Sequence, residues 1–159
     1  MSQRAQDLVQ RFETANNAMI DYIEACSEAD LNKVTAVEGW SVRVAAHHIA
    51  ASHEPVAGLA YLLATGGELP PLTMAIINQM NAQHAVDQAN VSKATVTDDL
   101  RQNGAKAAAM VAGLNDEQLD RSAHLGTFGA TMSTQQVIEN ILISHITYHL
   151  DSIKATVGK

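Results

Sequence analysis

The chain has 159 residues, 47% of them hydrophobic and 17% charged, which is a globular composition at a length that fits one domain, residues 1–159. Its formal net charge is −7 at pH 7, and the ten Lys and Arg residues are scattered without a basic run. Nucleic acid and anionic membranes are therefore excluded as expected partners, because binding phosphate groups requires a clustered positive face.

The N-terminal segment carries charges throughout and lacks the apolar core of a signal peptide. No window of the sequence reaches the apolar length of a transmembrane helix. The single cysteine, Cys26, rules out an internal disulfide and agrees with a reducing compartment. We therefore expect a cytoplasmic protein.

The first half of the chain predicts two long helices. Ser2 can cap the first, which continues to about Cys26 because its apolar residues recur at helical spacing. Ser41 can cap the second, which runs to Ala64, where Gly66 and the following glycine end it. The stretch between the two helices contains a short capped turn and a further glycine, so we expect the chain to break there.

The second half predicts one shorter helix and two long ones. The shorter helix follows the prolines at 70 and 71, and Ser92 or Thr95 can cap the next long helix, which ends near Asn115. Residues 121–132 have no apolar period and predict a loop long enough to suggest a function. The last helix begins at Ser133 and runs to about Val157.

This element order predicts the fold class. No segment predicts a strand, and the helices alone can supply a core. We therefore expect an all-α four-helix bundle with one extra shorter helix between the second and third long helices.

Two histidines near the C-terminus, His145 and His149, lie four positions apart on the last helix. A helix turns by about 100° per residue, so both rings project from one face and can bind the same ion. They also continue an apolar stripe, so both rings should be buried and need partners. Together with His48 they could hold zinc, nickel, copper or iron and leave a coordination position open.

Three segments resemble the DinB-like superfamily. GWSVRVAAHHIAASHE resembles its second-helix signature, in which a Trp-Ser pair precedes a metal-binding histidine by eight positions, here Trp40 before His48. SHITYHLDSI resembles its closing signature, in which two histidines four apart supply the other ligands, here His145 and His149. MNAQHAVDQANVSKATVTDDLRQNG is similar to the middle of members related to mycothiol-dependent maleylpyruvate isomerase.

The resemblance implies an up-down-down-up four-helix bundle, a homodimer and a divalent metal held by His48, His145 and His149. Zinc or nickel is the expected ion after purification, with iron or manganese as alternatives. Members with assigned chemistry are often metal-dependent transferases or hydrolases that act with low-molecular-weight bacterial thiols. A small-molecule substrate and a thiol cofactor are therefore implied here, with a metal-activated thiol or water as the nucleophile.

Two other interpretations remain open at this stage. In one, the protein is a non-catalytic, stress-related or accessory bundle whose metal is structural, adventitious or absent. An open coordination position beside a pocket would favour catalysis, and a closed site would favour structure. In the other, the three histidines are unrelated, and His48 lies far from the face that carries His145 and His149.

The remaining histidines are assigned no ligand role. We expect His47 to be partly solvated, because its direction on the helix differs from that of His48 by about 100°. His53 is expected to be a packed or surface residue, with a role near the metal as the lesser alternative. His84 and His124 lack a partner at ligand spacing, although the loop position of His124 also suits the rim of a pocket.

Carboxylates near the ligand helices could orient the imidazoles by accepting their second N–H group. Glu54, Glu139 and Asp151 are the candidates, although each is expected more often as a solvated charge. No nucleophile elbow, phosphate-binding glycine loop or dinucleotide fingerprint is present, so covalent catalysis and nucleotide cofactors gain no support.

Overall fold

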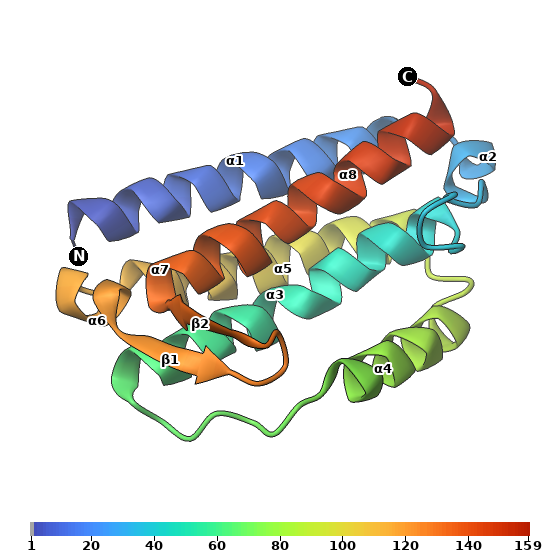
Figure 1. Ribbon diagram of the computed structural model, residues 1–159. Coiled ribbons are helices and arrows are strands. Elements are labelled where there is room, and N and C mark those ends of the chain that lie inside the picture. Colours follow the sequence, from blue (N-terminus) through green and yellow to red (C-terminus); the bar gives the residue numbers. More distant parts are fainter. Residues whose placement is uncertain (1) are drawn as a thin grey trace.

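The computed structural model describes residues 2–159, which fold into a bundle of long helices (Figure 1). Each long element begins and ends close to where the sequence predicts. The bundle helices are α1 (Gln3–Ala25), α3 (Val42–Thr65), α5 (Lys93–Ala112) and a last continuous helix made of α7 (Thr134–Val137), η1 (Ile138–Ile143) and α8 (Ser144–Val157).

The direction of the helices gives an up-down-down-up arrangement. Helices α3 and α5 run the same way and α1 and α8 run the opposite way (Figure 1). The parallel neighbours α3 and α5 pack extensively on each other and are joined by a crossover, residues 66–92, that returns along the bundle. The crossover contains the shorter helix α4 (Met74–Asp87). The predicted topology, including the extra helix, is therefore confirmed.

Local signals explain where the helices begin. The side chains of Ser2, Ser41 and Ser92 each accept a hydrogen bond from a backbone N–H in the first turn of α1, α3 and α5. Ser133 forms a capping box with Gln136 at the start of α7. Of the two caps considered for α5, Ser92 is the one used.

The last helix departs from the regular α-helix that its apolar spacing predicts. Segment η1 (Ile138–Ile143) has the wider π-helical hydrogen bonding, and the hydroxyl of Ser144 donates to the carbonyl of Glu139, five residues earlier. A π turn rotates the side chains that follow it relative to those before it. In this chain it comes directly before His145 and so contributes to the direction in which that ring projects.

Residues 121–132 are not the structureless loop that the sequence predicts. Strands β1 (Ser122–Leu125) and β2 (Ala130–Ser133) pair as an antiparallel hairpin, with Ser122 opposite Ser133 and Leu125 opposite Ala130. The expectation that the chain has no strand is therefore wrong. Each strand has only four residues, of which two are exposed, so its alternation of polar and apolar residues is too short to distinguish it from a loop. Between helix α5 and this hairpin lies the short helix α6 (Asp116–Asp120).

The core lies between the four bundle helices. It is filled by fully buried apolar side chains that include Phe12, Ile49, Leu100, Ile146 and Ile153. Among the described residues, no helix combines the length and the apolarity needed to cross a membrane.

Helix α4 differs from the bundle helices because none of its residues is buried. It lies outside the four bundle helices, on the side of α3 (Figure 1), and several of its apolar side chains remain exposed, including Met80 at 59% and Val86 at 72%. The helix therefore acts as a wall beside α3 and does not contribute to the core.

Candidate metal centre

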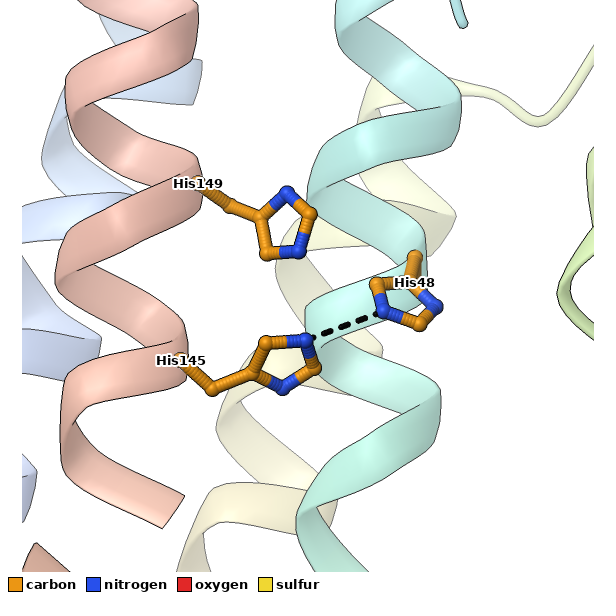
Figure 2. A group of neighbouring side chains, drawn as sticks. All are labelled: His48, His145 and His149. Carbon is orange, nitrogen blue, oxygen red and sulfur yellow. Dashed lines mark hydrogen bonds between the residues drawn. The ribbon is translucent and has the colours of Figure 1, made fainter. Parts of the chain in front are cut away.

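Three histidines from two helices come together inside the bundle. His48 on α3 faces His145 and His149 on α8 (Figure 2), and one ring nitrogen from each lies within 4.8 Å of the others. The Nε2 atoms of His48 and His145 are 3.1 Å apart. The interpretation in which His48 lies far from the other two is therefore wrong.

The spacing suits a small divalent ion. Two nitrogens bound to one tetrahedral ion at about 2.0–2.1 Å lie roughly 3.3 Å apart. The observed 3.1 Å between His48 and His145 is close to that value, so small side-chain rotations would complete the set. Three imidazoles are a donor set that suits zinc, nickel, copper or iron.

The outer nitrogen of His149 is held by a buried carboxylate. His149 Nδ1 lies 2.7 Å from Glu38 Oε1, and the hydroxyl of Ser152 donates to Glu38 Oε2 at 2.8 Å. Burial alone would raise the pKa of Glu38, but hydrogen bonds from Thr35 and Ser152 and the attraction of His149 keep it below its usual value. A carboxylate behind an imidazole fixes the ring and its tautomer, which is a recurring arrangement at metal sites.

The outer nitrogen of His145 also has a partner. Ser52 donates its hydroxyl proton to the carbonyl of Ile49 at 2.9 Å, so its oxygen is an acceptor for His145 Nδ1–H at 3.3 Å. Both histidines of α8 therefore carry their proton on Nδ1. Their Nε2 lone pairs remain for a ligand inside the cluster.

All three rings are neutral at pH 7. Burial and, to a smaller extent, the neighbouring histidines lower the pKa of His48 to about 3 and that of His145 to about 4. Burial also lowers the pKa of His149, although Glu38 partly opposes that shift. Protons therefore compete weakly with a metal ion for these nitrogens.

The three neutral rings direct nitrogen lone pairs toward one another, and none of the three contributes a positive charge. Without an ion, His48 can donate its Nε2–H to His145, which satisfies one of the converging lone pairs. A divalent ion would satisfy the lone pairs of all three rings at once. The donor set, the tautomers and the spacing thus fit a metal ion.

A large cavity of about 1270 Å³ adjoins the cluster, and His48 and His145 form part of its lining. Its walls come from α3, α4, the crossover, the hairpin and the last helix. His124 lines it from the hairpin, which agrees with the pocket-rim position considered for that residue. An ion held by the cluster would therefore face this cavity.

His53 lies outside the cluster. It is 1% exposed, its Nε2–H donates to Asn16 Oδ1 at 2.8 Å, and its ring meets Phe12 edge to face at 5.1 Å. The expectation of a packed histidine is confirmed, and the lesser alternative of a position at the metal is not.

His47 is buried, contrary to the expectation that it is partly solvated. It is 8% exposed because α4 and α5 cover it: its ring stacks on His84 and its Nε2 lies 3.0 Å from Asp99. His84 also lines the cavity, with its ring centre 6.0 Å from that of His48. Sequence reasoning missed this group because no helical spacing relates three separate helices.

The carboxylates considered as orienting groups lie elsewhere. Glu54 pairs with Lys106 and Glu139 with Arg11, both at the surface, and Asp151 is exposed. Glu38 has the orienting position instead. It precedes Trp40 by two residues in the loop before α3, and no pattern in the sequence relates this loop to His149.

Comparison with solved structures shows which proteins share this fold. The fold is similar to that of YfiT from Bacillus subtilis, a probable metal-dependent hydrolase with an unusual four-helix bundle topology, with a TM-score of 0.72 and 18% identity over 99% of this chain and 87% of that one. It is also similar to a histidine-to-alanine mutant of mycothiol-dependent maleylpyruvate isomerase, with a TM-score of 0.75 and 10% identity over 96% of this chain and 63% of that one.

A search of curated proteins finds no sequence match. The family model of the DinB superfamily, in contrast, matches residues 11–153, which is most of the chain. This protein therefore belongs to the DinB superfamily.

Proposed function

We propose that this protein is a metal-dependent enzyme whose divalent ion is held by His48, His145 and His149. The observation that carries the proposal is the convergence of three neutral imidazoles, two of which, His48 and His145, line a large cavity. Three protein ligands leave room for a further ligand, and the cavity is where such a ligand would lie. This arrangement favours a catalytic over a purely structural metal.

The reaction classes that fit are hydrolysis and transfer of a thiol to an electrophile. A divalent ion at this site would lower the pKa of a coordinated water or thiol towards neutrality. Glu38 and Ser52 hold the outer nitrogens of His149 and His145, so the ligand rings are already oriented before any ligand binds.

His84 is placed to accept a proton from a molecule in the cavity. Asp99 accepts from His47 Nε2, and His47 Nδ1 in turn accepts from His84 Nε2 at 3.2 Å, which leaves the lone pair on His84 Nδ1. Burial lowers the pKa of His84, so its ring is neutral at pH 7. A neutral ring at the lining can act as a general base.

The proposal also includes a small-molecule substrate, a cytoplasmic location and a homodimer. Exposed apolar residues on the outer side of α4, including Ile76 and Val86, support the dimer because they would otherwise face water. Light scattering on the purified chain would measure its mass, and a monomer at every concentration would overturn the dimer.

The first test is the metal content of the untagged protein, measured by elemental analysis after chelation and reloading. We expect one ion per chain in the natural protein and a loss of at least 100-fold in affinity in His48→Ala and in His145→Ala. The matched control is His124→Ala, which removes a histidine of the same cavity that lies outside the cluster and should keep its ion.

Two results would overturn the proposal. One is the absence of stoichiometric metal after incubation with zinc, nickel, manganese and ferrous iron. The other is an ion that remains in both His48→Ala and His145→Ala. Once a bound ion is established, hydrolysis of esters and the addition of thiols to electrophiles can be compared in loaded and chelated protein.

A further inference from the structure

The cavity beside the histidine cluster has a lining without charge. Among the described residues that line it there is no Lys, Arg, Asp or Glu. Most of the wall is apolar, with Leu59 and Leu62 from α3, Ile77 and Met80 from α4 and Phe128 from the hairpin turn. A charged group placed against this wall would lose its hydration and find no opposite charge.

The lining carries hydroxyl groups beside the histidine cluster, and its other polar residues, among them Tyr61, His124 and Thr127, are spread between apolar ones. Ser52 and Ser144 lie within about one helical turn of His48 and His145, at the end where an ion would be held. Along α3 the apolar wall continues to Leu62, which is about 21 Å beyond His48 at a rise of 1.5 Å per residue. The cavity therefore suits a molecule with a polar head and an extended apolar body.

The volume of the cavity and the net charge of the protein also favour an extended, uncharged ligand. The cavity of about 1270 Å³ exceeds the roughly 300–1000 Å³ common for small-molecule sites. The net charge of −7 also works against the approach of anions. A compact molecule with several carboxylates would leave most of the apolar wall uncovered and would bring charges that nothing in the lining neutralises.

We infer that the substrate of this site is a neutral molecule with an extended apolar part, bound with its reactive polar head at the histidine cluster. This inference rests on the proposed function for the ion that the head contacts. The length and the charge of the body follow from the lining and volume of the cavity and from the net charge of the chain, and do not depend on the ion.

The test uses zinc-loaded protein and a series of alkyl hydroxamic acids, whose head group binds metal ions. The dissociation constant should fall about fourfold for each added methylene from acetohydroxamic to octanohydroxamic acid. The eight-carbon analogue that ends in a carboxylate should bind at least about tenfold more weakly than octanohydroxamic acid. Isothermal titration measures each constant.

Two variants on α4 test whether the alkyl chain of the ligand contacts the lining of the cavity. Ile77→Lys puts a cation in the lining, so it should weaken octanohydroxamic acid at least about tenfold and strengthen the carboxylate-ended analogue. Gln79→Lys adds the same charge to the same helix at an exposed position outside the lining and should change neither constant. Because α4 buries none of its residues, neither substitution should unfold the bundle.

The outcomes separate this inference from the proposed function. If acetohydroxamic acid binds and longer chains bind no better, the open metal position stands and the apolar substrate class is wrong. If the ion is present and no hydroxamic acid binds, the open position is wrong. In that case displacement of a neutral solvatochromic dye by primary alcohols of increasing length tests the cavity without the metal, and equal displacement at every length would overturn the inference.

Discussion

Two of the histidine sites inside this bundle, that of His53 and the cluster of His48, His145 and His149, differ in what their nitrogens face. His53 donates its Nε2–H to Asn16, whose amide donates in turn to the carbonyl of Leu100 at 2.9 Å. In the cluster, the Nε2 atoms of His48 and His145 face each other at 3.1 Å. Burial lowers the pKa of His53 and of His145 alike, in each case to about 4.

The comparison shows that a shifted pKa does not by itself identify a functional histidine. Burial produces the same shift in a ring that is hydrogen-bonded within the core and in a ring that faces a cavity. What distinguishes the cluster is the direction of its lone pairs, which converge because Ser52 and Glu38 hold the opposite nitrogens. Burial should therefore govern acid stability, and the direction of the lone pairs should govern metal binding.

The largest expected effect is on the stability of the protein in acid. Replacing His53 or a histidine of the cluster should change this stability in the same way. The pKa of about 4 for folded His53 is below the usual value of 6.5, so the unfolded chain takes up the proton first as the pH falls. The stability linked to neutral His53 is full above about pH 6.5 and is lost towards pH 4, by about 3 kcal/mol in total. Urea unfolding of chelated protein from about pH 7.5 to about pH 4.5 should show a shallower pH slope in His53→Gln.

His145→Gln is the matched variant for this experiment. It should also reduce the pH slope of the chelated protein, because burial lowers the pKa of His145 in the same way. In the metal assay, however, only His145→Gln should lose its ion. If His53→Gln lost the ion as well, or left the pH slope unchanged, the division between the two groups would be wrong.

Removing the charge of Glu38 should weaken metal binding, and this effect should be somewhat smaller than the effect of His53 on acid stability. Glu38→Gln keeps the size of the side chain and an acceptor for His149 Nδ1–H but removes the negative charge, so affinity for zinc should fall about 10–100-fold. Competition with a chromogenic chelator measures this change. The matched control is Glu54→Gln, whose carboxylate pairs with Lys106 at the surface and should leave the affinity unchanged. Equal affinities in all three proteins would mean that Glu38 does not support the site.

The long helices could be predicted from the sequence because their signals are local. Ser2, Ser41 and Ser133 cap helices within three residues, and apolar spacing marks the face that is buried. The hairpin was missed because its strands have only four residues each and are defined by the pairing of their backbone groups. The π turn before His145 was missed because the same apolar residues fit a regular helix over so short a segment.

Of the candidate site, the three histidines could be predicted from the sequence and the residues around them could not. His145 and His149 share a helix, so their common face follows from their spacing, and family resemblance added His48 from a distant segment. Glu38 and His84 could not be found this way. Glu38 lies 111 positions from His149 and His84 lies 37 from His47, and only the packing of separate elements brings each pair together.

The smallest predicted effect concerns how tightly the His53 group is packed. A Cβ at Gly104, in α5, would lie 2.4 Å from the amide nitrogen of Asn16, which cannot move without losing its bonds to His53 and Leu100. Alanine gains about 1 kcal/mol over glycine inside a helix, but overpacking costs about 1–3 kcal/mol and should prevail. Gly104→Ala should therefore lower the free energy of unfolding by up to about 2 kcal/mol.

Gly58→Ala supplies the control, because a Cβ at that position in α3 meets nothing within 4 Å. It should raise the free energy of unfolding by up to about 1 kcal/mol, since the gain in helix propensity meets no steric cost. Urea unfolding of both variants gives the two signs directly. Stabilisation by both substitutions would mean that Asn16 has room to move, and His53 would then lack the fixed partner that distinguishes it from the histidines of the cluster.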